Sequence, residues 1–326
     1  MRKNDFKLKV VSPYSFQGKC LVLCIQFLGW VIFLFVGKKW SRPLPNFTDD
    51  SSRFGFKDIL FFSWKYYCHL LEKDDNYDKS KSTFADVDFS FDIPKDMPSA
   101  QITLHAGGDL MPYSWIQERY CPHLWDDIGD RFFAADLVIA NLETPILLSK
   151  PKSLVPEVML NEMHFNADRQ MFGLFNGQNK YKGFDFLSTA NNHSMDMGEE
   201  GVNGSIEFLR SKGIRQHGIA SKAEDAIAPV YIEIKGIRFA FMSWTYSLNK
   251  CKVPDDKPWM VNHLRVNESG VDLSPIIAQA REAKINGKAD VLILSLHYGN
   301  AYQSYPAIHI RENTSRIFCE AGIDLI

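Results

Sequence analysis

The 326-residue sequence has few cysteines and lacks the short motifs that mark the commonest nucleotide-binding and hydrolytic enzymes. Its six cysteines form no C-x-x-C pair, which argues against a disulfide scaffold and against a structural zinc site of the usual spacing. There is no P-loop, no G-x-S-x-G elbow and no H-E-x-x-H helix, so the kinase, α/β-hydrolase and zincin classes lack support. The net charge is only −2, which leaves no chain-wide basic footprint for nucleic acid.

The composition is that of a globular protein with an apolar N-terminal segment. Hydrophobic residues make up 45% and charged residues 23% of the chain, which excludes global disorder. Residues 20–37 form an uncharged run between basic flanks, close to the roughly 20 residues that span a bilayer. We therefore predict that residues 1–40 hold a single-pass membrane anchor. The alternative is a buried or surface-lying helix, which Gln26 favours.

The charges around this segment predict its orientation. Five basic residues and one acid precede it, whereas three basic residues follow it. The positive-inside rule then places the N-terminus in the cytoplasm and the rest of the chain outside, with a cytoplasmic domain as the alternative. No small-x-small site follows the apolar run, so a cleaved signal peptide is not expected.

The rest of the chain divides into a connector and one larger domain. Residues 41–98 are turn-rich and charged, apart from an amphipathic helix predicted over 54–71. From residue 99 to residue 326, apolar strands alternate with helical segments, which predicts an α/β domain. Strands are expected at 102–107, 136–140, 184–189, 230–234, 237–244 and 290–296, with a hairpin turn at Lys235-Gly236. Helices are expected at 127–135, 167–175, 202–209, 275–283 and 308–321, and a further strand begins at 323.

Four predicted strands end in side chains that bind metals or transfer protons. These side chains are Asp109, Glu143, the pair Asn192 and His193, and His297. Ligand sites in open α/β sheets gather outside the carboxyl ends of the strands, so we expect these residues to converge at one rim. Carboxylate, amide and imidazole groups together suit Mn, Fe or Zn, as one ion or as a pair. A metal pair can activate water and clamp a phosphoryl group.

Taken singly, each of these residues also suits a turn, a helix cap or a position near the core. It is their shared position at strand ends that favours a site. Among the other histidines, His217 in Gln216-His217-Gly218 is the best further candidate, whereas His105, inside a predicted strand, is expected to be structural.

Several segments follow one another in the order and spacing of a known family. They are GGDLM (107–111), DLVIANLETPI (136–146), FDFLSTANNHSMDMGEEGV (184–202), GIRQHGIA (213–220), APV (228–230), GIRFAFMSW (236–244) and ADVLILSLHYGNAY (289–302). On these segments, residues 101–326 resemble the capsule-synthesis CapA family, the poly-γ-glutamate capsule proteins with a calcineurin-like metallophosphoesterase fold. The resemblance implies a four-layer α-β-β-α sandwich of two mixed sheets, an N-terminal anchor with the domain outside, and a role in making, exporting or anchoring an anionic polymer capsule.

The resemblance also implies a role for each candidate residue. Asp109 would be the first metal ligand, and Glu143 would take the place of the usual bridging carboxylate. Asn192 would bind the second metal, and His297 would be a further ligand. His193 would be the acid or charge stabiliser of phosphoester chemistry.

Two departures from the family pattern bear on activity. The family usually reads His-Trp-Gly-x-Glu-Tyr at the last motif, whereas HYGNAY here puts Ala301 in place of the acid. The family also continues past the AGIDLI-like strand into a Gly-His-x-Pro-His motif. The domain at 99–326 is therefore expected to be incomplete at its C-terminus, with an open site and weak metal retention.

Three functions follow from these observations. The first is a membrane-tethered, metal-dependent phosphoesterase-type hydrolase in capsule or other cell-surface polymer biosynthesis, acting on an anionic polymer or its phosphoester precursor. The second is a non-catalytic, membrane-tethered subunit of a polymer synthase or export complex. The third is a degenerate domain without metal.

Overall fold

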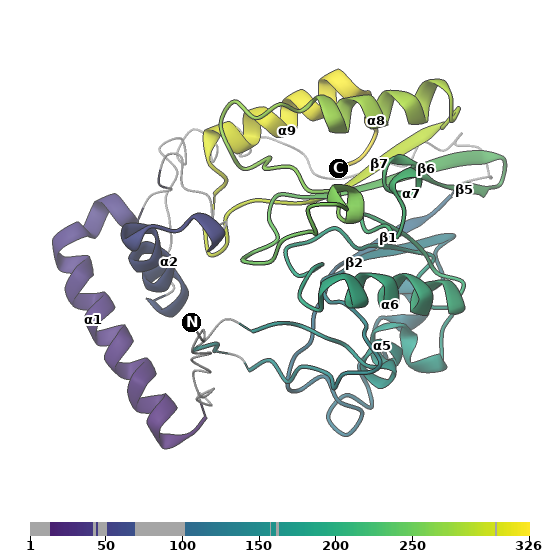
Figure 1. The fold of residues 1–326 in the computed structure, drawn as a ribbon. Helices are drawn as coiled ribbons and strands as arrows, with labels where there is room; N and C mark the ends of the chain where they lie inside the picture. Colours follow the sequence, from purple (N-terminus) through teal and green to yellow (C-terminus); the bar gives the residue numbers. More distant parts are fainter. Residues whose placement is uncertain are drawn as a thin grey trace, which may run out of the picture.

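The computed structural model describes two parts of the chain, a pair of N-terminal helices and an α/β domain (Figure 1). The described residues are 14–41, 44, 51–68, 102–156, 158–160, 163–303 and 305–326. The basic residues before position 14 and the charged stretch at 72–82 lie outside these described residues. The division of the chain at residues 40 and 98 stays a prediction.

The apolar N-terminal run forms a long helix, α1 (Phe16–Trp40), in which Ser15 caps the first turn by accepting the N–H of Gly18 at 3.0 Å. Its 22-residue stretch Phe16–Gly37 is long and apolar enough to cross a membrane, and only 6% of its most apolar window is buried. A signal sequence meets the same test of length and composition. The backbone departs from helical geometry at Gly37, where the apolar run ends.

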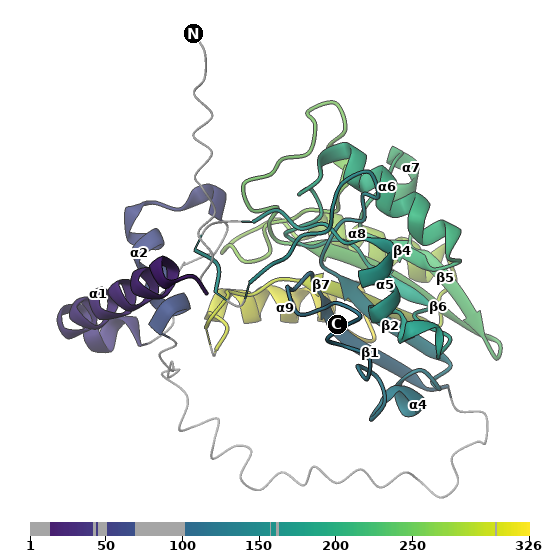
Figure 2. The same ribbon diagram turned by 90° about the horizontal axis from the view of Figure 1, so that it is seen from below.

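A second helix, α2 (Phe56–Cys68), packs against α1 within the part of the connector for which a helix is predicted. Phe61 and Trp64 of α2 are buried, and Phe33 of α1 stacks on Trp64 at 5.7 Å. A Cβ at Gly29 would overlap the sulfur of Cys68, so glycine permits this close approach. In both views the two helices lie to one side of the α/β domain (Figures 1 and 2).

The first sheet of the domain has four parallel strands in the order β1-β2-β3-β4. They are β1 (Leu104–Leu110), β2 (Leu137–Leu142), β3 (Phe186–Ser188) and β4 (Arg215–His217). Helices α4 (Gly129–Phe132), α5 (Arg169–Phe175) and α6 (Gly198–Ser211) contribute to the same buried cluster as β2 and β3, and the short α7 (Ala223–Ile227) follows β4 in the chain. The sequence did not predict β4, because Arg-Gln-His has no apolar pattern. The helix predicted at 127–135 shortens to the single turn of α4.

The second sheet has three strands in the order β5-β6-β7. The predicted hairpin is present: β5 (Val230–Ile234) and β6 (Ile237–Thr245) are antiparallel, and both turn residues, Lys235 and Gly236, have positive φ. Strand β7 (Val291–His297) runs parallel to β6. Two longer helices, α8 (Ser274–Ile285) and α9 (Ile308–Ala321), accompany this sheet, and short 3₁₀ turns lie at Ser51–Arg53, Gly177–Asn179 and Pro258–Met260. The strand predicted from residue 323 is present only as an isolated parallel bridge between Leu325 and Ile293, which places the segment after α9 beside β7.

The two sheets pack face to face through an apolar layer. Leu137 and Phe186 of the first sheet share a buried cluster with Phe239, Phe241 and Ile293 of the second, and the rings of Phe186 and Phe241 stack at 4.5 Å. Helices α5 and α6 lie on one side of the paired sheets, and α8 and α9 lie on the other (Figure 1). The expectation of two mixed sheets is wrong for the first sheet, whose described strands are all parallel, and holds for the second.

His217, at the end of β4, joins the two sheets. The side chain is 2% exposed, and its Nδ1 accepts the backbone N–H of Ser243 on β6 at 2.9 Å. Burial lowers the pKa of His217 to about 4, so the ring is neutral at physiological pH. His217 is therefore part of the core and not of the predicted site.

This burial predicts a stability that depends on pH. The pKa of His217 in the folded protein, about 4, lies below the value of about 6.5 in an unfolded chain, so between these two pH values the unfolded chain binds a proton that the folded protein does not. The contribution of His217 should be constant above pH 6.5 and should fall by about 3 kcal/mol as the pH drops to 4. Urea unfolding of His217→Gln should lose this slope, whereas His123→Gln, at an exposed position, should keep it.

Candidate functional site

The end of β1 presents Asp109 through an irregularity in the strand. Three residues of β1 advance from Ala106 to Asp109 while two residues of β2 advance from Ile139 to Asn141, which is a one-residue bulge. Asp109 therefore pairs with Asn141, whose Nδ2 donates to Asp109 Oδ1 at 2.8 Å. Asp109 lies inside the last part of β1. The sequence predicted instead that the strand ends at residue 107 and that Asp109 follows it.

Three of the candidate residues meet at this edge of the sheets. Glu143 follows β2 directly, and its N–H donates to the carbonyl of Leu110 at 3.0 Å. His297 is the last residue of β7 in the other sheet. One ligand atom each of Asp109, Glu143 and His297 lies within 4.8 Å of the other two. The structure thus brings side chains from both sheets together, in an arrangement that can hold a metal ion.

Asn192 reaches the same cluster from the turn after β3. Its Oδ1 lies 3.0 Å from His297 Nε2, and Asn249 binds its backbone carbonyl at 3.2 Å. On its other side, His297 Nδ1 lies 3.3 Å from the Nδ2 of Asn141, a donor. Nδ1 therefore accepts and Nε2 carries the proton, which is the neutral form of the ring. Burial, the largest cause, lowers the pKa of His297, in agreement with this form.

His193 lies beside the cluster, held by an aspartate that sequence reasoning missed. Its Nδ1 donates to Asp196 Oδ2 at 2.6 Å, and its ring stacks on Phe165 at a centroid distance of 3.7 Å. Phe165 also donates its N–H to the same carboxylate oxygen at 2.6 Å. With Nδ1 committed, His193 Nε2 faces the cluster at 3.9 Å from Glu143 Oε1. The ring is thus fixed in both tautomer and direction.

Glu143 is electrostatically perturbed by its burial in the site. Burial raises its pKa to about 9, and the neighbouring charge of Asp109 adds to the shift. The buried carboxyl therefore holds a proton unless a cation takes its place. Two carboxyl groups, an imidazole and an amide oxygen form the donor set that divalent Mn, Fe or Zn prefers. The residues present fit a metal ion, and their role as ligands stays a prediction.

Sequence reasoning missed two of the residues that position this site. Asn141 and Asp196 lie inside the quoted NLETP and NNHSMD segments, at a strand end and three residues after His193, and those positions were the available signals. Neither role is visible without the contacts that link separate loops. His105, by contrast, has the structural place expected of it, with Nδ1 hydrogen-bonded to the carbonyl of Phe132 at 2.9 Å.

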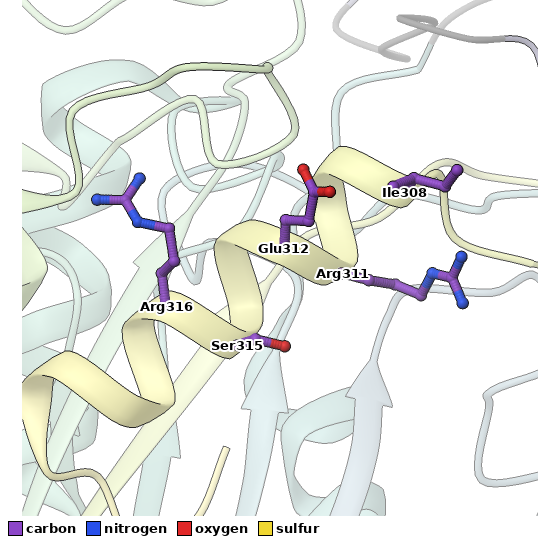
Figure 3. A pocket seen from close by; sticks show the side chains of 5 residues that line it. All are labelled: Ile308, Arg311, Glu312, Ser315 and Arg316. Carbon is purple, nitrogen blue, oxygen red and sulfur yellow. The ribbon is translucent and has the colours of Figure 1, made fainter.

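A hollow of about 670 Å³ lies elsewhere on the surface, along α9 (Figure 3). It is lined by Ile308, Arg311, Glu312, Ser315 and Arg316. It shares no residue with the carboxylate and histidine cluster, and all of its lining comes from one helix. It is therefore not the candidate site.

Comparisons with known proteins find curated relatives over two thirds of this chain. A protein named PGA biosynthesis protein CapA, from Bacillus subtilis (strain 168), is 23% identical over 227 residues, which is 67% of this chain and 54% of that protein. Uncharacterized protein y4sH, from Sinorhizobium fredii (strain NBRC 101917 / NGR234), is 26% identical over 227 residues, with 67% and 46% covered. The chain spans about half the length of these curated relatives.

Similarity to solved structures is low. A hypothetical protein from Thermus thermophilus overlaps 59% of this chain and 66% of its own at 19% identity, with a TM-score of 0.28, which supports no conclusion about the fold. The family model described as Bacterial capsule synthesis protein PGA_cap matches residues 103–326, which is more than half of the chain. The resemblance to CapA proteins is thereby confirmed, and the chain belongs to the bacterial capsule synthesis protein PGA_cap family.

Proposed function

We propose that this protein is a membrane-anchored, metal-dependent phosphoesterase-type hydrolase of capsule or other cell-surface polymer biosynthesis. Family membership supports the polymer part of the proposal, and the site supports the hydrolase part. The observation that carries it is the meeting of Asp109, Glu143 and His297, with one ligand atom of each within 4.8 Å of the others. The substrate would be an anionic polymer, such as poly-γ-glutamate, or its phosphoester precursor.

In this proposal Asp109, Glu143, Asn192 and His297 hold one or two divalent ions. A bound ion supplies an activated water and a positive charge for a phosphoryl oxygen. His193 directs Nε2 at the reaction centre and, once Nε2 has bound a proton, donates that proton to the leaving oxygen or stabilises its charge. Asp196 holds the proton on Nδ1, so that Nε2 is the atom that exchanges protons, and Phe165 shields one face of the ring.

The fold proposed around this site is a four-layer α-β-β-α sandwich of the metallophosphoesterase type. The face-to-face sheets and the helices on both outer sides support it. The largely unburied α1 supports a single-pass anchor. The larger number of basic residues before this helix favours placing the domain outside the cytoplasm. Subunits of a polymer synthase are the partners proposed for such an anchored domain.

The proposed activity is tested with a generic phosphodiester, bis(4-nitrophenyl) phosphate, and the full chain in detergent. Turnover should require added Mn²⁺, stop with EDTA and return with fresh Mn²⁺. Turnover that is insensitive to EDTA would contradict the proposal.

Ala301 favours a second candidate function. The family motif has a glutamate where Ala301 stands, and loss of an acid near the site suits a non-catalytic, membrane-tethered subunit of the polymer synthase or export complex. The same assay separates the two functions, because such a subunit binds metal without turnover. A degenerate domain would show neither binding nor turnover.

The anchor makes its own prediction. The exposed apolar side chains of α1 include Phe16, Phe27, Trp30 and Phe35, and they gain more from lipid than from water. The full chain should therefore need detergent and should float with liposomes, whereas a chain shortened to residues 88–326 should stay soluble. A full chain that stays soluble and monomeric without detergent would rule out the anchor.

A further inference from the structure

Three loops bring a histidine and a cysteine close to Asp196, the aspartate that holds His193. His164 precedes α5, Asp196 lies in the turn between β3 and α6, and Cys251 lies in the loop after β6. One ligand atom of each lies within 4.8 Å of the other two, although 32 positions separate His164 from Asp196 and 55 separate Asp196 from Cys251. This cluster shares no residue with the cluster of Asp109, Glu143 and His297.

The carboxylate at the centre of this second cluster is buried, with 3% of its side chain exposed. Its Oδ2 accepts from His193 Nδ1 and from the N–H of Phe165, both at 2.6 Å. Its other oxygen, Oδ1, faces the sulfur of Cys251 at 3.9 Å. A thiol is a weak donor, so Oδ1 keeps acceptor capacity in a buried position, where a cation would satisfy it.

His164 is oriented as metal-binding histidines usually are. Its Nδ1 lies 2.9 Å from the backbone carbonyl of Asp196, which accepts hydrogen bonds only. Nδ1 therefore carries the proton of the neutral ring, and the lone pair is on Nε2. A hydrogen bond of this kind is the common outer partner of a ligating imidazole. His164 is also exposed, so ions in solution can reach the cluster.

We propose that His164, Asp196 and Cys251 form a second metal site, selective for Zn²⁺. Imidazole nitrogen, carboxylate oxygen and thiolate sulfur are the ligands of zinc, and three protein ligands leave the fourth tetrahedral position to water. The thiol loses its proton when the ion binds. The first cluster has no sulfur, so the second differs from it in preferring softer ions.

The position of this site gives it a consequence for His193. Zinc on Asp196 Oδ1 leaves Oδ2 in place as the acceptor for His193 Nδ1. Without the ion, the Asp196 carboxylate is held by its hydrogen bonds alone; with the ion, it is also held by a metal bond. Asp196 is therefore a positioning residue that both sites share. The zinc site itself stands without the proposed hydrolase activity, because it rests on a different set of ligands.

Co²⁺ replaces Zn²⁺ in such sites and gives a thiolate-to-metal charge-transfer band, which reports sulfur coordination directly. The full chain in detergent, titrated with Co²⁺, should show this band. Cys251→Ser should abolish it, and Cys319→Ser, a matched change at an exposed cysteine of α9, should leave it intact. His164→Ala should weaken Co²⁺ binding by more than about 100-fold, since it removes a direct ligand.

A second measurement needs no variant. Zn²⁺ should protect Cys251 of the wild-type chain from iodoacetamide, as read by peptide mass spectrometry, and should leave Cys319 reactive.

Glu143→Gln should keep the Co²⁺ band, because it alters only the first cluster, so failure of the hydrolase proposal would leave this result untouched. Absence of the band in the wild-type chain, its survival in Cys251→Ser, its loss in Glu143→Gln, or equal alkylation of Cys251 with and without Zn²⁺ would each overturn the proposal.

Discussion

Glu143→Gln should abolish metal-dependent turnover and weaken Mn²⁺ binding by more than about 100-fold. The change removes a direct ligand, and loss of a residue that only supports a ligand already weakens metal binding by about 10–100-fold. The same change should not destabilise the metal-free protein, because burial raises the pKa of Glu143 to about 9. Without metal the carboxyl is uncharged, and glutamine copies its shape and its hydrogen bonds. The metal-free variant should therefore be at least as stable as the wild type.

Thermal unfolding with and without Mn²⁺ measures both effects. At a Mn²⁺ concentration of about 100 times Kd, the wild-type chain should gain about 2.7 kcal/mol of stability, whereas Glu143→Gln should gain almost none. Glu118→Gln, on the loop after β1 and outside the cluster, is the control and should behave as the wild type. Equal stabilisation of wild type and Glu143→Gln would show that the ion binds elsewhere.

His193→Ala should lower kcat for a phosphodiester by about 10²–10⁴-fold and should leave Mn²⁺ affinity nearly unchanged. His193 directs Nε2 at the cluster and holds Nδ1 on Asp196, so it is placed to transfer a proton and not to anchor the ion. Asp196→Asn should lower kcat as well, because the amide frees the ring to turn.

Steady-state kinetics at saturating Mn²⁺, with titration calorimetry for the affinity, separates the two roles. The matched control is His123→Ala, whose side chain is 79% exposed on a distant loop. If His193→Ala lost metal and activity together, His193 would be a ligand. If it kept full activity, the proton would come from another group.

Much of the fold was predictable because its strands are apolar and its turns have standard residues. The runs at β2, β6 and β7 bury side chains on both faces, and the Lys235-Gly236 pair supplies the positive φ that a tight hairpin needs. Strand β4 was not predictable, since three polar residues become a strand only by pairing with β3. The bulge before Asp109 depends in the same way on its partner strand.

The candidate site was predictable as a set of residues and not as a network. Asp109, Glu143, Asn192, His193 and His297 all lie at the ends of apolar strands predicted from the sequence, and that pattern selected them. The contacts that orient them join distant parts of the chain: Asn141 and His297 are 156 positions apart, and Asn192 and His297 are 105 positions apart. Perturbed pKa values follow from burial, which no local pattern contains. The roles of Asp196 and Cys251 were not predicted either, because they depend on contacts between distant parts of the chain.

The central claim is that one rim of the paired sheets holds a divalent metal between Asp109, Glu143, Asn192 and His297. The position of Mn²⁺ in an anomalous difference map from crystals of the protein tests this most directly. We expect a peak at about 2.0–2.2 Å from oxygen or nitrogen atoms of at least three of these side chains. An empty rim at saturating Mn²⁺, or a peak bound by other residues, would contradict the claim.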